Sequence, residues 1–188
     1  MSKPTNSLLS IAKNVLRYLK GSIDFSLKFT KQSSPMHLLG YCDSDWGSAE
    51  DRKSLTGYCF MLNNSGPVIS WKCKKQQTVA LSSCEAEYMA MSYAIQEGLF
   101  IKQLLFDLLQ ENFKIHLGID NQGSILLAQN PVNHQRSKHI DIRYHFIRDE
   151  ILKKNVDLFY VNSSNNPADM FTKPFNSKKL CDFQYIRG

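Results

Sequence analysis

The sequence predicts an α/β protein built around one mixed β-sheet. Three strand-like segments follow one another between residues 37 and 73, and helices and strands alternate after residue 83. A run of strands forms an antiparallel meander, whereas alternating strands and helices place parallel strands together through crossover helices. The expected sheet therefore joins antiparallel strands to parallel ones.

Hydrophobic spacing and turn residues locate the individual elements. Apolar residues recur at helical spacing near the N-terminus, and alternating apolar residues bounded by turn-forming residues indicate strands. We expect Asn6 to cap the first helix and Gly98 to be a point where the longest helix can break. The expected elements, in order, are a helix over 7–19, a short strand over 24–30, strands over 37–45, 54–62 and 67–73, a helix over 83–110, a strand over 114–120, a short helix after Asn121, a helix over 138–153, a strand over 156–161 and a short helix after Pro167.

Length and composition favour one main domain that binds a polyanion. The chain has 188 residues and a formal net charge of +6, an excess that favours polyanionic partners through counterion release. No apolar run approaches the ~18 residues that a membrane span needs, so we expect no membrane partner. The five cysteines are odd in number and have no paired spacing, which indicates a reducing compartment rather than a disulfide framework or a zinc site.

Four acidic residues lie far apart in the chain, each where the end of a strand or helix can direct it to a common point. They are Asp43, Glu87, Asp120 and Asp169, in the words YCDSDW, SSCEAEYMAM, GIDNQGS and NNPADMFTK. Carboxylates gathered without basic partners repel one another and lose hydration, so a fold that collects them usually binds divalent metal as well. Four such positions suit a site for two metal ions, which clamp the attacking and leaving oxygens of a phosphodiester.

Two of these assignments have close competitors in sequence. Asp43 and Asp45 leave the same face of one strand, so periodicity does not choose between them. Glu85 and Glu87 point to nearly opposite sides of a helix. Glu87 heads the apolar face, whereas Glu85 suits the first turn, with Ser82 or Ser83 as the cap.

The other two acids also have a structural alternative. Asp120 ends an apolar strand at the edge where open α/β sheets carry their sites, yet it could also cap the helix that follows. Asp169 follows Asn166-Pro167-Ala168 at the start of the last short helix, which is again a capping position. Both roles can coexist in either residue.

Four successive blocks of the chain resemble a known family. They are YCDSDWGSAEDRKSLTGYCFML, ISWKCKKQQTVALSSCEAEYMAM, IDNQGSILLAQNPVNHQRSKHIDIRYHFIRDEI and YVNSSNNPADMFTKP. In this order they resemble the ribonuclease H domain at the C-terminus of reverse transcriptases from Copia/Ty1-type long-terminal-repeat retrotransposons. The resemblance implies a ribonuclease H-like mixed five-stranded sheet flanked by helices, with the domain over residues 36–175. It also makes residues 1–35 the end of the polymerase connection region and residues 176–188 a C-terminal tail.

The resemblance assigns roles to particular residues. Asp43, Glu87, Asp120 and Asp169 match the catalytic and metal-binding acids, which bind two Mg²⁺ ions, with Mn²⁺ as a substitute. Ser83 and Gln122 match positions that contact the minor groove of an RNA–DNA hybrid. Basic side chains would follow the phosphates, and those proposed are Lys72, Lys74, Lys75, Arg136, Lys138, Arg143 and Arg148. Trp46 and Trp71 are expected in the core.

The implied activity is hydrolysis of the RNA strand of RNA–DNA hybrids during retrotransposon reverse transcription. The partners would be the hybrid and the polymerase region of the same polyprotein, in cytoplasmic virus-like particles or the nucleus and without secretion. The loop over residues 161–166 lacks the histidine that related enzymes use to help product leave. Two alternatives remain: an inactive ribonuclease H-like scaffold that only holds the hybrid, and an integrase or transposase, which typically uses three acids ending in a glutamate.

Overall fold

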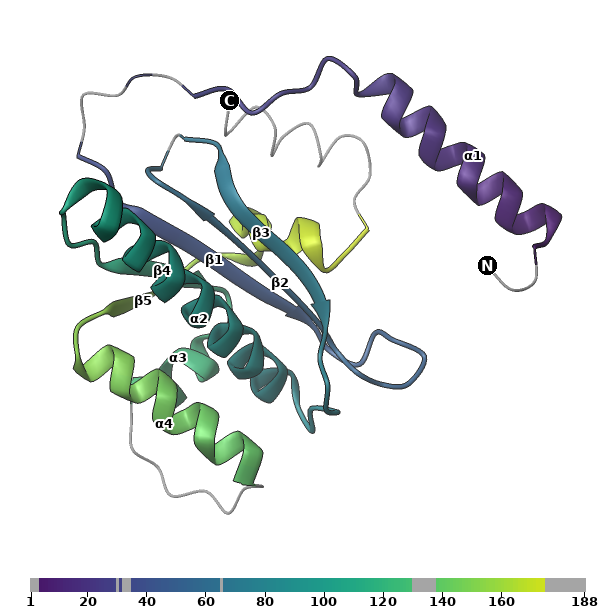
Figure 1. Ribbon diagram of the computed structural model, residues 1–188. Coiled ribbons are helices and arrows are strands. Elements are labelled where there is room, and N and C mark those ends of the chain that lie inside the picture. The colour runs from purple at the N-terminus through teal and green to yellow at the C-terminus, as the bar shows by residue number, and fades with distance from the viewer. Residues whose placement is uncertain (1–3, 30, 32–34, 65, 130–137, 175–188) are drawn as a thin grey trace.

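A single five-stranded sheet organises the molecule, in a computed structural model that describes residues 4–29, 31, 35–64, 66–129 and 138–174 (Figure 1). The strand order is β3-β2-β1-β4-β5. The strands are β1 (Leu38–Asp45), β2 (Leu55–Met61), β3 (Val68–Lys75), β4 (Ile115–Ile119) and β5 (Val156–Tyr160). The first three pair antiparallel, and β4 pairs parallel to both β1 and β5. The predicted mixed sheet is confirmed.

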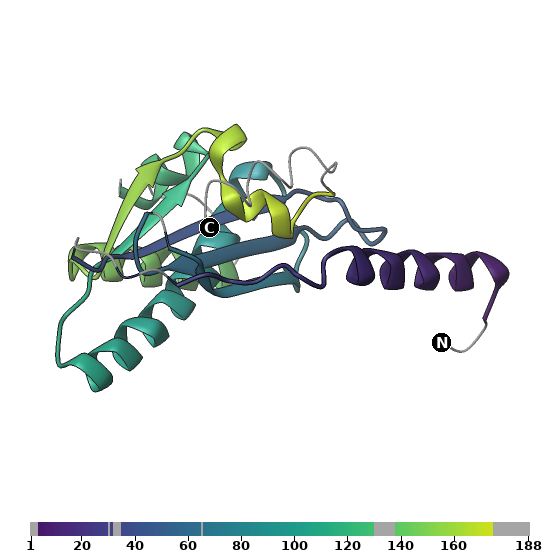
Figure 2. The same ribbon diagram turned by 90° about the horizontal axis from the view of Figure 1, so that it is seen from above.

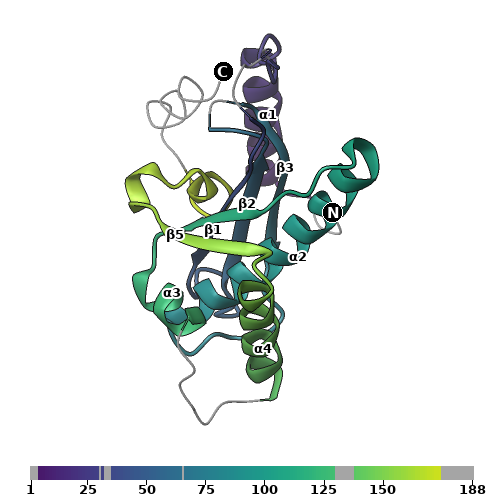
Figure 3. The same cartoon turned by 90° about the vertical axis from the view of Figure 1, so that its left-hand side faces the viewer.

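Helices cover one face of this sheet, and the larger part of the hydrophobic core lies between them and the sheet. They are α2 (Ser83–Leu109), α3 (Gln122–Gln129) and α4 (Lys138–Leu152). The views show α2 and α4 together, and their contact includes Tyr88 stacked on Tyr144 with ring centroids 3.9 Å apart (Figures 1 and 3). The buried side chains on this face include Phe60, Met91 and Ile115. Hydrophobic burial therefore holds α2 against the sheet.

The opposite face carries a smaller cover made by two short 3₁₀ helices near the end of the chain. These are η1 (Ser163–Asn165) and η2 (Pro167–Phe171). Phe171 of η2 packs against a small cluster that includes Cys59 and Met61 of β2. A Cβ atom added at Gly57 would lie 2.8 Å from the carbonyl oxygen of Ala168, so glycine allows η2 to lie directly on the backbone of β2.

The long helix α2 is unbroken, so the predicted break at Gly98 is wrong. Gly98 is buried against the sheet, and a Cβ atom there would lie 3.0 Å from Cδ1 of Ile115 and 3.1 Å from Phe60. This glycine permits close approach of helix and sheet rather than a change of direction. Packing against the sheet compensates for its low helix propensity.

The N-terminal segment differs from the sheet domain and from two predictions. The first helix, α1 (Asn6–Gly21), has no buried residue and extends away from the sheet (Figure 2). Its N-cap is Thr5, whose side chain accepts from the N–H of Leu8, so the cap predicted at Asn6 is wrong. The strand predicted over 24–30 is also absent from the described part of that range, because residues 25–29 form no ladder with a neighbouring strand.

Both tryptophans are exposed, which corrects the prediction that they belong to the core. Trp46 is 53% exposed and Trp71 is 56% exposed. Trp46 follows the end of β1 and donates its indole N–H to the carbonyl oxygen of Ala80. Trp71 lies on the edge strand β3, on the face opposite α2, where no described helix covers it.

Candidate active site

The topology brings acidic residues from separate elements to one end of the sheet. Asp43 lies on β1, and Asp120 directly follows β4. The parallel pairing of these neighbouring strands matches Tyr41 with Gly118, and both aspartates come two residues later. Asp169 approaches from η2 on the other side of β1. The two parallel strands and η2 therefore converge on Asp43.

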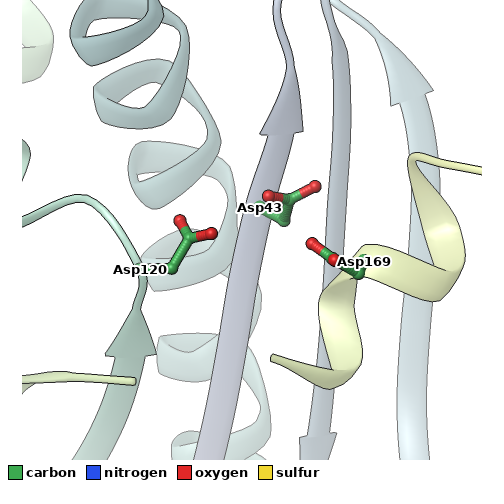
Figure 4. Close-up of side chains that lie close together, drawn as sticks. All are labelled: Asp43, Asp120 and Asp169. Atoms are coloured by element: carbon green, nitrogen blue, oxygen red, sulfur yellow. The ribbon is translucent and has the colours of Figure 1, made fainter. Parts of the chain in front are cut away.

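Three aspartates form the closest acidic group. One carboxylate oxygen from each of Asp43, Asp120 and Asp169 lies within 4.8 Å of the others (Figure 4). Asp43 and Asp169 are buried, and Asp120 is half-buried at the surface. The structure brings Asp43 into this group, whereas Asp45 of the same strand is not part of it among the described residues. We call Asp43, Asp120 and Asp169 the aspartate triad.

Glu87 lies beside the aspartate triad, 5% exposed, in the second turn of α2. Its Oε1 accepts from both the backbone N–H and the hydroxyl of Ser44, each at 2.9 Å. Its Oε2 is buried and has no hydrogen-bond partner among the described residues. A buried carboxylate oxygen without a donor is costly unless a cation or a proton satisfies it.

The competing glutamate, Glu85, lies in the first turn of α2 with Ser82 as the N-cap, as predicted. The Glu85 N–H donates to the hydroxyl of Ser82, the N-cap of α2, and its side chain accepts from the N–H of Leu81. This arrangement resembles a capping box, except that the glutamate accepts from the residue before the N-cap. One glutamate therefore ends in the cap and the other beside the triad, as helix geometry requires of residues two apart.

Burial and like charges disfavour ionisation in this group. Burial raises the pKa of Glu87 to about 8, and the carboxylates of Asp43 and Asp120 add to this effect. Burial also raises the pKa of Asp43 to about 6, against the opposing hydrogen bond from Thr172 and charge of Lys173. The site thus holds negative charge at a cost that a bound cation would reduce.

Asn166 anchors the segment that carries Asp169. Its side chain is fully buried, donates to the carbonyl oxygen of Cys42 at 3.0 Å and accepts from the N–H of Ala168. Asn166 is therefore the N-cap of η2 and ties it to β1 beside Asp43. Asp169 does not serve as that cap, and Asn121, not Asp120, accepts from the N–H of Ser124 at the start of α3.

Two residues that the sequence analysis did not single out contact the triad. Thr172 donates its hydroxyl to Oδ2 of Asp43. Lys173 approaches Oδ1 of both Asp43 and Asp169. Their signal in the sequence is position alone, since Thr172 and Lys173 follow Asp169 by three and four residues, about one helical turn.

The donor set fits a divalent cation. Mg²⁺ prefers oxygen ligands and usually binds through a few carboxylates. The triad offers three such groups, and the unpartnered Oε2 of Glu87 offers a fourth on the side of Asp43 nearest α2. The residues at this end of the sheet could therefore hold a metal ion.

The structure describes only some of the residues predicted to bind substrate. Ser83 and Gln122 are exposed first residues of α2 and α3, the two helices that begin nearest the acids. Arg136 lies outside the described residues, and Lys138 begins α4 with its side chain outside them. Their predicted roles remain predictions.

The other basic residues divide between the surface and internal packing. Lys74 and Arg143 lie on the ring of Tyr93, 4.8 and 4.6 Å from its centroid. Arg148 donates to the carbonyl oxygen of Leu127, and Lys75 forms a salt bridge with Asp51. Arg148 therefore contributes to the contact between α3 and α4.

Solved structures define the class of fold. The chain is similar to a ribonuclease H1 isolated from compost by a metagenomic approach, with a TM-score of 0.56 and 13% identity over 72% of this chain and 92% of that one. A structure of that enzyme in complex with an RNA/DNA hybrid matches with a TM-score of 0.51 and 14% identity, over 72% of this chain and 93% of that one. The fold is ribonuclease H-like, and its acidic group lies at the end of the central strands.

Sequence comparison identifies the family. The chain is 39% identical over 184 residues to the retrovirus-related Pol polyprotein from transposon TNT 1-94 of Nicotiana tabacum, which covers 96% of this chain and 14% of that polyprotein. No family model matches the chain. Over 96% of its length the chain thus matches a Copia-type Pol polyprotein, and it spans about a seventh of the length of this relative.

Proposed function

We propose that this protein hydrolyses the RNA strand of RNA–DNA hybrids during reverse transcription of a retrotransposon. The observation that supports this most directly is the aspartate triad, which gathers oxygens within 4.8 Å from three separate elements of a ribonuclease H-like fold. Collecting three carboxylates has a desolvation cost that packing alone does not explain. A phosphodiester-cleaving metal site explains it.

The acids would hold Mg²⁺ in this proposal, with Mn²⁺ as a substitute. Asp43, Glu87, Asp120 and Asp169 are the ligands, and two ions would supply activation of water and charge stabilisation at the departing 3′ oxygen. Ser44 fixes Oε1 of Glu87, so its Oε2 is directed away from that anchor. Asn166 keeps Asp169 on the flank of β1, so the ligand positions are set before a metal binds.

The hybrid would lie across the exposed starts of α2 and α3. Ser83 and Gln122 are the exposed first residues of these helices, and in this proposal they would contact the minor groove, where the 2′-hydroxyl distinguishes RNA from DNA. Lys72, Lys74, Tyr93 and Glu97 are among the residues that line a pocket of about 220 Å³ between β3 and α2, and Arg143 lies on the ring of the same Tyr93. These cations would contact phosphates, which set affinity but carry no sequence information.

The decisive experiment is cleavage of a labelled RNA–DNA hybrid with Mg²⁺. Wild-type protein should cut the RNA strand, and Asp120→Asn should lower the rate roughly a hundredfold or more, because a ligand to the metal is lost. Asp157→Asn is the matched control, since Asp157 is half-exposed and lies at the start of β5, away from the acids. Uncut RNA with the wild-type protein would favour the inactive scaffold, and joining of DNA strands would favour an integrase.

We further propose that residues 1–35 are the end of the polymerase connection region and that residues 36–175 are the nuclease domain. The apolar side chains of α1 are exposed, and so are Phe25, Leu27 and Phe29, so this segment lacks a packing partner among the described residues. The polymerase region of the same polyprotein would cover it, in virus-like particles in the cytoplasm or in the nucleus. Alone, the protein should bind hybrid more weakly than micromolar at physiological salt, and nanomolar binding measured by fluorescence anisotropy would contradict this.

A further inference from the structure

Lys173 is the cation of the acidic site. Its Nζ lies 2.9 Å from Oδ1 of Asp169 and 3.4 Å from Oδ1 of Asp43. The structure shows no other salt bridge to the aspartate triad or to Glu87 within the described ranges. The side chain of Lys173 is 38% exposed, so its flexible stem has a route to solvent.

These contacts involve the oxygens that a metal ion would use. On Asp43, Oδ1 faces Lys173 and Oδ2 accepts from Thr172, so both oxygens already have a donor from the segment after Asp169. On Asp169, Oδ1 has the same lysine. The ammonium group therefore lies against one oxygen of each aspartate, where its positive charge opposes a divalent ion that would bind both.

We propose that Lys173 is a positioning residue that competes with the metal ion for Asp43 and Asp169. Before a metal binds, it holds these two carboxylates together and offsets their repulsion. When a metal binds, its ammonium group withdraws toward solvent, and its return favours metal release. The inference rests on the proposed function, because it assigns the acids to a metal.

The competing explanation is that Lys173 has only a structural role. The two explanations predict opposite changes in metal affinity when Lys173 is removed. If Lys173 only holds the aspartates in place, its removal lets them separate, and metal binding weakens or stays the same. If Lys173 competes, its removal frees two ligands and removes a repelling charge, so metal binding becomes tighter. The sign of the change in affinity therefore decides between them.

The test is isothermal titration calorimetry, in which Mn²⁺ is titrated into the whole protein without nucleic acid. Lys173→Met should bind Mn²⁺ about tenfold more tightly than wild type, since a full charge is lost beside the ligands. Lys173→Arg should bind as wild type or more weakly, because it keeps the charge. Lys114→Met is the matched control, since Lys114 pairs with Asp157 at the far end of β4 and its removal changes net charge equally.

The melting temperature supplies a second measurement, because in EDTA it reports the effect of Lys173 on stability without a bound metal. In EDTA, Lys173→Met should melt below wild type because Asp43 and Asp169 lose their counterion, and saturating Mn²⁺ should remove that difference. Lys173→Gln replaces the methionine variant if circular dichroism shows that the latter is unfolded. Unchanged or weaker Mn²⁺ affinity in these variants, with wild-type binding intact, overturns the inference and leaves the proposed function standing. If wild-type protein binds no Mn²⁺ and cuts hybrid no better than Asp120→Asn, both the inference and the proposed function are overturned.

Discussion

The two flanks of Asp43 differ in how their charge is balanced. On the flank of η2, Asp169 shares Lys173 with Asp43, and Thr172 adds a hydrogen bond. On the flank of α2 and β4, Glu87 and Asp120 form no salt bridge with any described residue, and Glu87 depends on Ser44 alone. The chain thus supplies one counterion to the η2 half of its acidic site and leaves the other half to protons or to an external cation.

Burial raises the pKa of both Glu87 and Asp43, and the η2 flank opposes this rise at Asp43 through the hydrogen bond from Thr172 and the charge of Lys173. Both carboxyls are buried beside like charges, but only Asp43 has a nearby lysine that favours ionisation. A metal ion would therefore stabilise the ionised carboxylates most on the flank of Glu87 and Asp120, which has no lysine. Three experiments test this difference between the two flanks.

The largest expected effect is the pH dependence of stability without metal. The pKa of Asp43 is raised from 3.8 to about 6 and that of Glu87 from 4.5 to about 8, so the folded protein holds more protons than the unfolded chain between about pH 4 and 8. The free energy of unfolding should therefore fall as pH rises through this window. Asp43 alone contributes about 3 kcal/mol over its whole titration and roughly half of that above pH 5. Melting in EDTA at pH 5 and pH 8 measures the fall, expected at about 2–4 °C for each kcal/mol.

Addition of Mg²⁺ is the control for this prediction. A bound cation favours the ionised carboxylates, so the loss of stability at pH 8 should shrink with Mg²⁺ and persist with Na⁺ at equal ionic strength. A melting temperature that rises between pH 5 and 8 in EDTA would show that these carboxyls are not destabilising when charged.

The next effect is that of Glu87→Gln, which should separate activity from stability. The glutamine keeps an acceptor for Ser44 and removes the buried charge. Cleavage of hybrid should fall roughly a hundredfold, whereas the metal-free protein should melt higher than wild type at pH 8 and equal to it at pH 5. Glu85→Gln is the control, because Glu85 caps α2; it should cut hybrid at a rate close to wild type.

Periodicity predicted the parts of the site that depend on a single element. The helical face separated Glu87 from Glu85, and the end of an apolar strand located Asp120, because these positions follow from the geometry of one helix or strand. The same reasoning predicted the five strands of the sheet. It failed for Trp71, since hydrophobicity does not reveal that β3 is an edge strand with one face uncovered.

Contacts between distant elements could not be predicted in this way. Lys173 reaches Asp43 because Asn166 fixes η2 to β1, and that contact joins residues more than 120 positions apart. Local sequence patterns hold no information about which lysine will face which acid. The absence of a break at Gly98 has the same origin, since it depends on Phe60 and Ile115 across the core.

The smallest effect should come from Asp45→Asn, on the same strand as Asp43. Sequence periodicity does not separate these two aspartates, but the structure places Asp43 between both flanks, whereas Asp45 is half-buried at the end of β1 and outside the aspartate triad. Loss of the Asp45 charge should therefore change the cleavage rate by less than about threefold, because surface charges act weakly at a distance in salt solution. Steady-state cleavage at 0.15 M salt measures it against Asp43→Asn, which should be inactive. A loss in Asp45→Asn as large as that in Asp43→Asn would mean that the metal binds nearer the end of β1, away from the flank that Lys173 neutralises.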